Sequence, residues 1–294
     1  MIPWTSAHLF HAGDLDALII RVVAPLVADL TPRRFFFLRY WEGGPHLRVR
    51  LLPSSPSHAR SIERELLRRG RAHLAAHASH RSLTIESYAV QAARHAHGER
   101  LDRHDTRLHP NDTVEFIPYQ PEQHIFGAME PVERHFTDSS RLAMNLLRSH
   151  PDHAQRAASV LAAVTMTLSA CGADPDAFRL PSLPPIVRQA YDARHDDLRR
   201  QTRGLWTDTR GRDGWQRSIR RLRHGLGRPP PGTRSPLGFL SHAVPAERRA
   251  AADILLRCTH LLANRLGLPQ PAEVHVGLLA AHILSDLSKT GDLS

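Results

Sequence analysis

The stretch FFFLRYWEGGPHLRVRL, residues 35–51, constrains the fold more than any other part of this chain. Its first half is a short apolar run rich in aromatic residues, which predicts a strand. The EGGP that follows is a turn signal. HLRVRLLP then alternates apolar and cationic residues, the period-2 pattern of a half-buried strand. Residues 35–52 therefore predict a β-hairpin with a Gly-Gly-Pro tip.

The rest of the first third is predicted to add strands and helices to this hairpin. Residues 3–12 alternate as a first strand, and Asp14 can cap the apolar helix that follows and ends just before a proline. Residues 56–80 are expected to be helical, with arginines between the apolar positions. Residues 82–90, SLTIESYAV, return to strand character. Residues 91–115 are polar and predict an exposed insertion or mobile loop.

From about Met129 the chain is mostly helical, apart from a loop predicted at RPPPGTRSP, residues 228–236. The predicted helices cover 129–149, 153–171, 184–201, 213–224, 245–266 and about 271–288. Strands collected first and helices later are typical of an α+β fold. We expect a single domain over 1–294, strand-rich over 1–128 and helical over 129–294, with the antiparallel sheet packed against helices.

The residues offer little to a metal or a cofactor. Cys171 and Cys258 each stand alone in a helical segment, which suggests neither a disulfide nor a structural zinc site. The histidines around the expected insertion are irregularly spaced and have no cysteine nearby; they are His80, His95, His97, His104 and His109. Glycine-rich phosphate loops and GxSxG or HExxH motifs are missing. We therefore expect no metal and no cofactor.

The chain has no basic region followed by an apolar run at its start, so no signal peptide is predicted. No stretch approaches the roughly 20 apolar residues that a membrane-spanning helix needs. These features predict a cytoplasmic protein with no membrane partner.

Charge favours an anionic partner. Lys and Arg number 39 against 29 acidic residues, a net charge of +10, and nearly all the cations are arginine. Such a surface can follow a phosphate backbone or attract an acidic peptide. The absence of helix-turn-helix, zinc-finger and interleaved aromatic patterns disfavours nucleic acid. A GC-rich genome would also enrich arginine, so the charge does not identify the partner.

The hairpin stretch resembles the opening of the lantibiotic dehydratase C-terminal domain, also called the thiopeptide-type bacteriocin biosynthesis domain. Residues 4–19 are similar to that family's first strand and helix. YQPEQHIFGAMEPVERHFTDSS, residues 119–140, resembles its Y-x-P-E-x-x-R-Y-G-G block and the following helix. THLLANRLGL, residues 259–268, matches its H-x-x-x-N-R-L segment. The chain begins at the domain's own first strand, so we expect a stand-alone member without the glutamylating module.

The resemblance implies one of two reactions on a modified precursor peptide with an acidic leader. The first is β-elimination of glutamate from glutamylated Ser or Thr. The second, in thiopeptide assembly, is a formal [4+2] cycloaddition of two dehydroalanines that forms a central pyridine, with loss of water and of the leader peptide. It also implies action beside other enzymes of the biosynthetic cluster, and a homodimer is one assembly open to it.

The residues distinguish these reactions only in part. Elimination in the family uses an arginine of the HLR strand, an arginine of R-Y-G-G and the C-terminal histidine. Arg48 and His260 match, but Ile125 stands where the second arginine is expected, and an apolar residue cannot clamp a carboxylate. His124 or a distant arginine could substitute for it.

Cycloaddition poses an orientation problem more than a charge problem, with acid–base work in the iminol shift and the later losses. A pocket that has lost one arginine but keeps a histidine, a tyrosine and a carboxylate suits cycloaddition better. We therefore predict a pyridine synthase. The alternatives are a glutamate-eliminating partner of a separate glutamyl transferase and a non-catalytic leader-binding scaffold. The candidate catalytic residues are His260, Tyr119, Glu122 and Arg48, and the candidate substrate-binding residues are Arg39, Arg50, His46, Asn264 and Arg265.

Each candidate also has a structural alternative. The arginines can form surface ion pairs, His260 can be a packed core histidine, and Tyr119 and Glu122 can close a turn.

Overall fold

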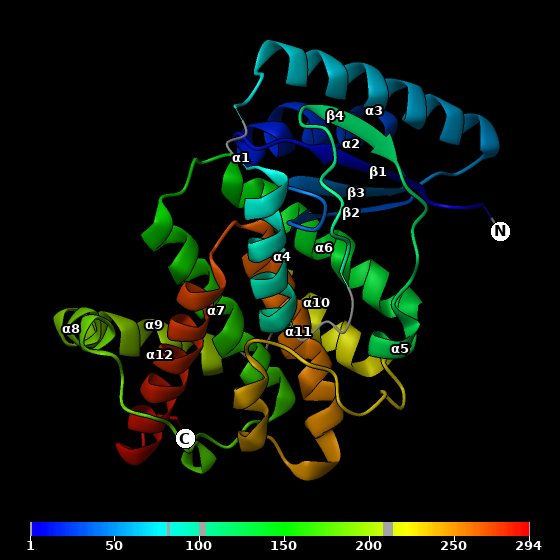
Figure 1. Ribbon diagram of the computed structural model, residues 1–294. Helices are drawn as coiled ribbons and strands as arrows, with labels where there is room; N and C mark the ends of the chain where they lie inside the picture. Colours follow the sequence, from blue (N-terminus) through cyan, green and yellow to red (C-terminus); the bar gives the residue numbers. More distant parts are fainter. Residues whose placement is uncertain (1, 81–82, 100–103, 208–213, 294) are drawn as a thin grey trace. The chain divides into compact units, whose positions relative to one another are not determined.

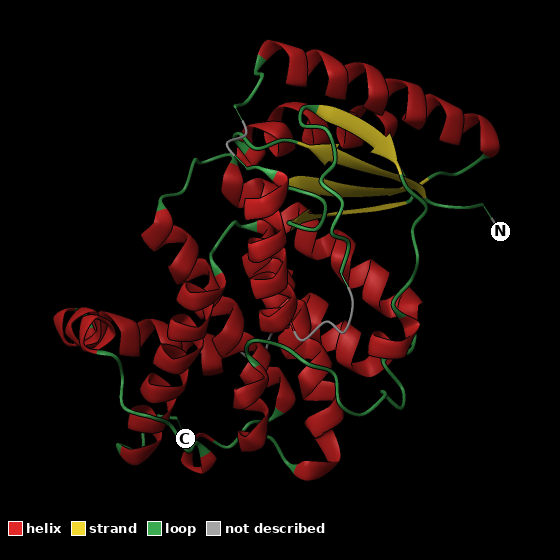
Figure 2. Ribbon diagram, viewed as in Figure 1, coloured by secondary structure: helices red, strands yellow, loops and turns green. Residues whose placement is uncertain are grey.

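The computed structural model describes residues 2–80, 83–99, 104–207 and 214–293. The chain forms two compact units. Unit 1 comprises residues 1–121 and 143–149, and unit 2 comprises residues 122–142 and 150–294. Figure 2 shows the strands in unit 1 and helices through the rest of the chain. The predicted α+β class with an antiparallel sheet is confirmed, and folding as one domain stays a prediction.

The sheet of unit 1 has four strands in the order β2-β3-β1-β4, each antiparallel to its neighbour. They are β1 (Thr5–Phe10), β2 (Arg34–Tyr40), β3 (His46–Leu52) and β4 (Thr113–Phe116). The predicted hairpin is confirmed. Its tip turns where the Gly44 N–H donates to the Trp41 carbonyl at 2.9 Å. Gly43 and Gly44 have φ of +85° and +109°, which explains the glycine pair.

Helices cover one face of the sheet (Figure 1). Asp14 caps the first of them as predicted, and its carboxylate accepts from the N–H groups of Asp16 and Ala17. Side chains that alternate along the strands, such as Leu9 and Phe37, are fully buried on this face. Gly70 of the long helix brings its backbone close to Leu9. The covering helices are α1 (Leu15–Leu18), η1 (Ile19–Val23), α2 (Ala24–Leu30) and α3 (Pro56–Ala76).

The strand predicted over 82–90 is wrong, and the loop predicted over 91–115 is right only over 104–112, where the described residues form neither helix nor strand. Helix α4 (Ile85–Glu99) occupies most of this region, and β4 lies at its end; residues 82 and 100–103 lie outside the described part. Tyr88, Ala92 and Ala96 are buried at four-residue spacing, a helical period that the β-branched residues concealed. Thr84 accepts a hydrogen bond from the Ser87 N–H at 3.2 Å, as a helix cap does.

Unit 2 is helical, as predicted. The segment expected as one helix over 184–201 is two helices, because Arg194 leaves the helical backbone region at φ −131°. The expected helix over 245–266 opens with a 3-10 turn. The elements are α5 (Gln123–Phe126), α6 (Met129–Leu147, whose last turn belongs to unit 1), α7 (His153–Cys171), η2 (Pro175–Ala177), α8 (Pro185–Ala193), α9 (His195–Thr207), α10 (Gly214–Gly225), η3 (Gly238–Ala243), η4 (Ala246–Arg248), α11 (Arg249–Arg265) and α12 (Gln270–Lys289).

Helix α7 carries much of the core of unit 2. It begins with a capping box at Asp152 and Gln155 and ends at Gly172, whose φ of +67° favours glycine. Cys171 and Cys258 are both free and buried, as expected for core thiols. Over the described residues, no helix combines the length and apolar character that crossing a membrane requires.

Candidate active site

The face of the sheet opposite α3 in unit 1 carries polar side chains among aromatic ones. Strand alternation places Arg48 and Arg50 of β3 on this face together with His46. The register sets His8 of β1 opposite Arg48, and Tyr40 of β2 opposite His46. The predicted half-buried β3 strand therefore presents its cationic side chains beside two histidines and a tyrosine.

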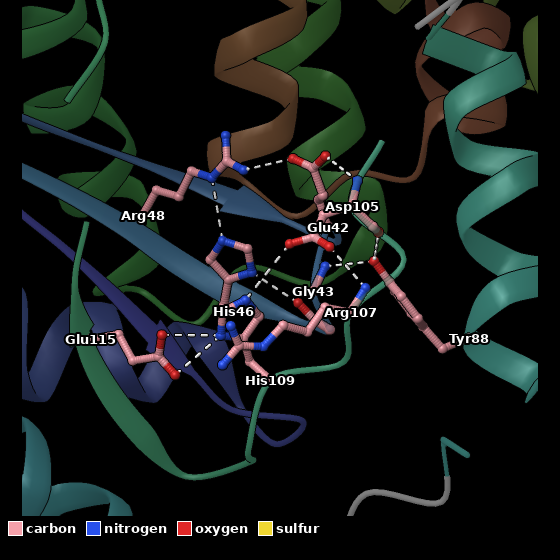
Figure 3. A network of polar contacts seen from close by, with 10 residues as sticks. Glu42, Gly43, His46, Arg48, Tyr88, Asp105, Arg107, His109 and Glu115 are labelled. Carbon is pink, nitrogen blue, oxygen red and sulfur yellow. Dashed lines mark hydrogen bonds and ion pairs between the residues drawn. The ribbon is translucent and has the colours of Figure 1, made fainter. Parts of the chain in front are cut away.

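Arg48 is held by Tyr40, His46 and Glu42, and Figure 3 shows its contacts with the last two. Its guanidinium carbon lies 3.4 Å from the centre of the Tyr40 ring, a close cation–π contact. Its Nε–H donates to His46 Nε2 at 3.2 Å, and one terminal nitrogen donates to Glu42 Oε2 at 3.1 Å. Arg48 is 24% exposed and Glu42 is 23% exposed. The positive charge of Arg48 is thus compensated by a carboxylate while one surface stays accessible.

The hairpin tip is tied to the segment that follows α4 (Figure 3). The second oxygen of Glu42 accepts from the Asp105 N–H at 2.8 Å. The Tyr88 hydroxyl accepts from the Gly43 N–H and donates to the Asp105 carbonyl, both at 2.6 Å. Glu42 is therefore fixed at both oxygens, and α4 takes part in orienting Arg48 through Tyr88.

His8 and His46 are neutral at ordinary pH. Burial, reinforced by the nearby arginines, lowers the pKa of His8 to about 2 and that of His46 to about 3. The His46 Nδ1–H donates to the Gly44 carbonyl at 2.8 Å, which leaves Nε2 as the acceptor for Arg48. His8 Nε2 lies 2.9 Å from an Arg50 nitrogen. Both imidazoles thus serve as hydrogen-bond acceptors for guanidinium groups.

These lowered pKa values predict acid sensitivity. Unfolding restores the ordinary histidine pKa of 6.5, so below that pH the unfolded chain binds more protons than the folded chain. The free energy of unfolding should fall as pH drops from 6.5 toward 3, by about 1.4 kcal/mol per pH unit for each histidine. Urea unfolding between about pH 7 and pH 5 measures this slope. His46→Gln should reduce this slope by about 1.4 kcal/mol per pH unit, the contribution of one proton. An unchanged slope would contradict the conclusion that His46 is neutral in the folded protein.

Tyr119 lies beside Arg50 in an aromatic group. Its ring makes edge contacts with Trp4 and Phe36, at centroid distances of 5.6 and 5.5 Å. The Arg50 guanidinium lies 5.9 Å from the ring centre of Tyr119. Arg50 also donates to the carbonyls of Ala7 and Val49, both at 3.2 Å, and burial lowers its pKa to about 10. The structure therefore brings Tyr119, Arg50, Arg48 and His46 together within unit 1.

Arg39 differs from these residues. It lies opposite Leu47, on the face that the helices cover, and forms an ion pair with Asp16 at the start of α1. Its role in substrate binding stays a prediction.

The remaining candidates belong to unit 2. His260 lies on α11, and its Nδ1–H donates to Glu273 Oε2 of α12 at 2.8 Å. Asn264 is half-buried one turn later on α11. Arg265 is fully buried, donates to the hydroxyls of Ser139 and Ser140, and burial lowers its pKa to about 9. The geometry gives Arg265 a packing role within α6 and α11, and its part in substrate binding stays a prediction.

An arginine from another helix lies beside the block that carries Ile125. Glu122 is exposed, and its carboxylate lies 3.9 Å from a guanidinium nitrogen of Arg257 on α11. The same guanidinium lies 5.8 Å from the ring centre of Phe126 and donates to the Arg234 carbonyl at 2.9 Å. Arg257 thus provides a cation beside Glu122 and Phe126, in the block where Ile125 stands in place of an arginine.

Sequence reasoning missed several residues of these groups. Arg257 could have been found from its three-residue spacing to His260, which puts both on one side of a helix. His8 shares the alternation of the first strand. Tyr88 and Glu273 gave no local signal, because their contacts lie in other elements of the fold. Glu42 is only six residues from Arg48, but the anchoring of its second oxygen by Asp105 is distant in the chain. Among the described residues, no cluster of histidine, cysteine or carboxylate side chains could hold a metal ion.

Comparison with known families shows which family the chain belongs to. The model of the family described as lantibiotic biosynthesis dehydratase C-terminal matches residues 4–284. The chain belongs to that family. No protein of curated function matches it significantly.

Solved structures similar to this lantibiotic dehydratase C-terminal family member share its fold. The pyridine synthase TbtD from thiomuracin biosynthesis has a TM-score of 0.71 at 18% identity, with 98% of this chain and 99% of that chain covered. TsrL has a TM-score of 0.58 at 16% identity, with 97% and 95% covered. The tRNA-dependent lantibiotic dehydratase MibB from Microbispora sp. 107891 has 0.55 at 17% identity, with 98% of this chain but 28% of that chain covered.

Proposed function

We propose that this protein is a pyridine synthase that tailors a ribosomally made thiopeptide precursor. The observation that carries the proposal is the compensated charge of the polar sheet face. Arg48 is paired with Glu42, and His8 and His46 are neutral. A partly exposed arginine that is already paired with a carboxylate, next to neutral imidazoles and aromatic rings, suits flat, neutral dehydroalanines better than it suits a departing carboxylate. Membership of the lantibiotic dehydratase C-terminal family supports a tailoring role in general.

In this proposal the enzyme joins two dehydroalanines after one neighbouring amide has shifted to its iminol form. Two new bonds close the six-membered ring; water and then the leader peptide, as its amide, leave to give the aromatic pyridine. On unit 1, Arg48 anchors a backbone carbonyl and Tyr119 packs against the substrate, with Arg50 and His46 beside them. Arg39, on the other face of the sheet, is a separate binding candidate. The candidates in unit 2 are His260 and Glu122 for proton transfer and Asn264 and Arg265 for binding.

The partners follow from this reaction. We propose that the protein acts on a modified precursor peptide whose acidic leader is attracted by the net charge of +10. Other enzymes of the cluster would install the dehydroalanines. A cytoplasmic location and assembly as a homodimer belong to the same proposal.

Mass spectrometry on a synthetic precursor with two dehydroalanines tests the reaction. We expect loss of one water and release of the intact leader amide, and a ring absorbance in the remaining core. An unchanged mass under conditions where the labelled precursor binds would reject the proposal and leave a leader-binding scaffold.

One observation favours glutamate elimination as the second candidate. Arg257 lies beside Glu122 and could bind a leaving glutamate in place of the arginine that Ile125 replaces. A glutamylated Ser or Thr substrate tests this candidate directly. Release of free glutamate with formation of a dehydroamino acid, suppressed in Arg257→Met, would establish it.

A further inference from the structure

Glu273 is a carboxylate placed where a side chain of its type is rarely found. It lies in the first turn of α12 and is 1% exposed. The positive end of the helix dipole favours a carboxylate there, but burial of an unpaired charge is strongly unfavourable. Glu273 Oε2 accepts from His260 Nδ1 at 2.8 Å, whereas its Oε1 is buried and has no hydrogen-bond partner within the described part of the chain. The carboxylate is therefore directed at His260.

This contact determines the state of the histidine ring. A carboxylate that accepts from Nδ1–H fixes that tautomer and the ring orientation, and it stabilises the imidazolium when the other nitrogen takes up a proton. The His260 side chain is 19% exposed, and its Nε2 has no partner among the residues that the structure describes. Its lone pair is thus available to an incoming group.

We propose that Glu273 is a positioning residue that holds His260 as a proton-transfer group. The inference rests on the proposed function. His260 Nε2 removes the proton from the substrate amide nitrogen, and the resulting imidazolium returns a proton to the amide oxygen, which yields the iminol without net gain or loss of protons. Glu273 accepts the Nδ1–H hydrogen bond throughout.

Substitution of Glu273 provides the kinetic test. Glu273→Gln keeps the shape but removes the charge, and we expect kcat to fall by roughly 100-fold or more with little change in KM. Glu273→Asp keeps the charge, and we expect it to recover part of the rate. The matched control is Glu130→Gln, which neutralises an exposed carboxylate of the same unit that pairs with Arg134. We expect the control to retain kcat within about twofold.

Nitrogen NMR of the labelled histidines separates this inference from the proposed function. In the wild-type protein His260 should be in the Nδ1–H tautomer, and Glu273→Gln should shift it toward a tautomer mixture. An Nε2–H tautomer in the wild-type protein overturns the inference even if no pyridine forms. Pyridine formation with kcat unaffected by Glu273→Gln also overturns it, while leaving the proposed function in place. If Glu273→Gln fails to fold, the inference is tested by the His260 tautomer in the wild-type spectrum and by kcat of Glu273→Asp.

Discussion

Arg48→Met is expected to lower kcat for pyridine formation by roughly 100-fold, which corresponds to about 2.7 kcal/mol of transition-state stabilisation. Methionine approximates the length of the side chain but cannot donate to a substrate carbonyl. The loss should fall on kcat more than on KM, because the proposed anchor holds the reacting groups in orientation. Steady-state rates on the two-dehydroalanine precursor, quantified by mass spectrometry, measure the effect.

Two further variants sharpen this prediction. Arg48→Lys keeps the charge but loses the planar stacking on Tyr40 and the Nε–H donated to His46, so we expect little recovery. Full recovery by lysine would mean that only charge matters at this position. Arg68→Met is the control, since Arg68 lies exposed on α3 in an ion pair with Glu65. A similar rate loss in the control would indicate a general effect on the protein.

Phe37→Ala is expected to destabilise unit 1 by about 3–5 kcal/mol, the range typical of removing a large aromatic side chain from a core. Phe37 lies on β2 opposite Val49, is fully buried, and belongs to the sheet face that the helices cover. Its loss leaves a cavity beneath the strands that carry Arg48. The midpoint of urea unfolding measures the change.

Phe116→Ala provides the matched comparison, because it removes the same side chain from the same sheet. Phe116 ends β4 and is 42% exposed, so we expect its loss to cost about 1 kcal/mol or less. Equal shifts in the two variants would mean that the burial of Phe37 does not determine how much it stabilises unit 1. The rate of pyridine formation, in which Arg48 is proposed to take part, should be the same in Phe116→Ala as in the wild-type protein.

The hairpin could be predicted because its determinants are local. Alternating apolar and cationic residues over 46–52 and a glycine pair at the tip are properties of neighbouring residues, and the structure confirms both. Helix α4 was not predicted, because Thr84, Ile85 and Tyr88 favour strands by type even though the buried positions follow a helical period. Strand β4 was missed because its four residues are stabilised by pairing with β1, far away in the chain.

The sequence by itself determined the hairpin, the α+β class, the family and the position of Arg48 on the cationic side of a strand. Only the tertiary structure decided which carboxylates pair with the cationic and imidazole side chains. Glu42 meets Arg48 at the hairpin tip, Arg257 reaches Glu122, and Glu273 lies behind His260. The physical reason is that burial and ion pairing depend on contacts between separate elements, which no local pattern encodes. The proposal of cycloaddition rather than glutamate elimination rests on those contacts.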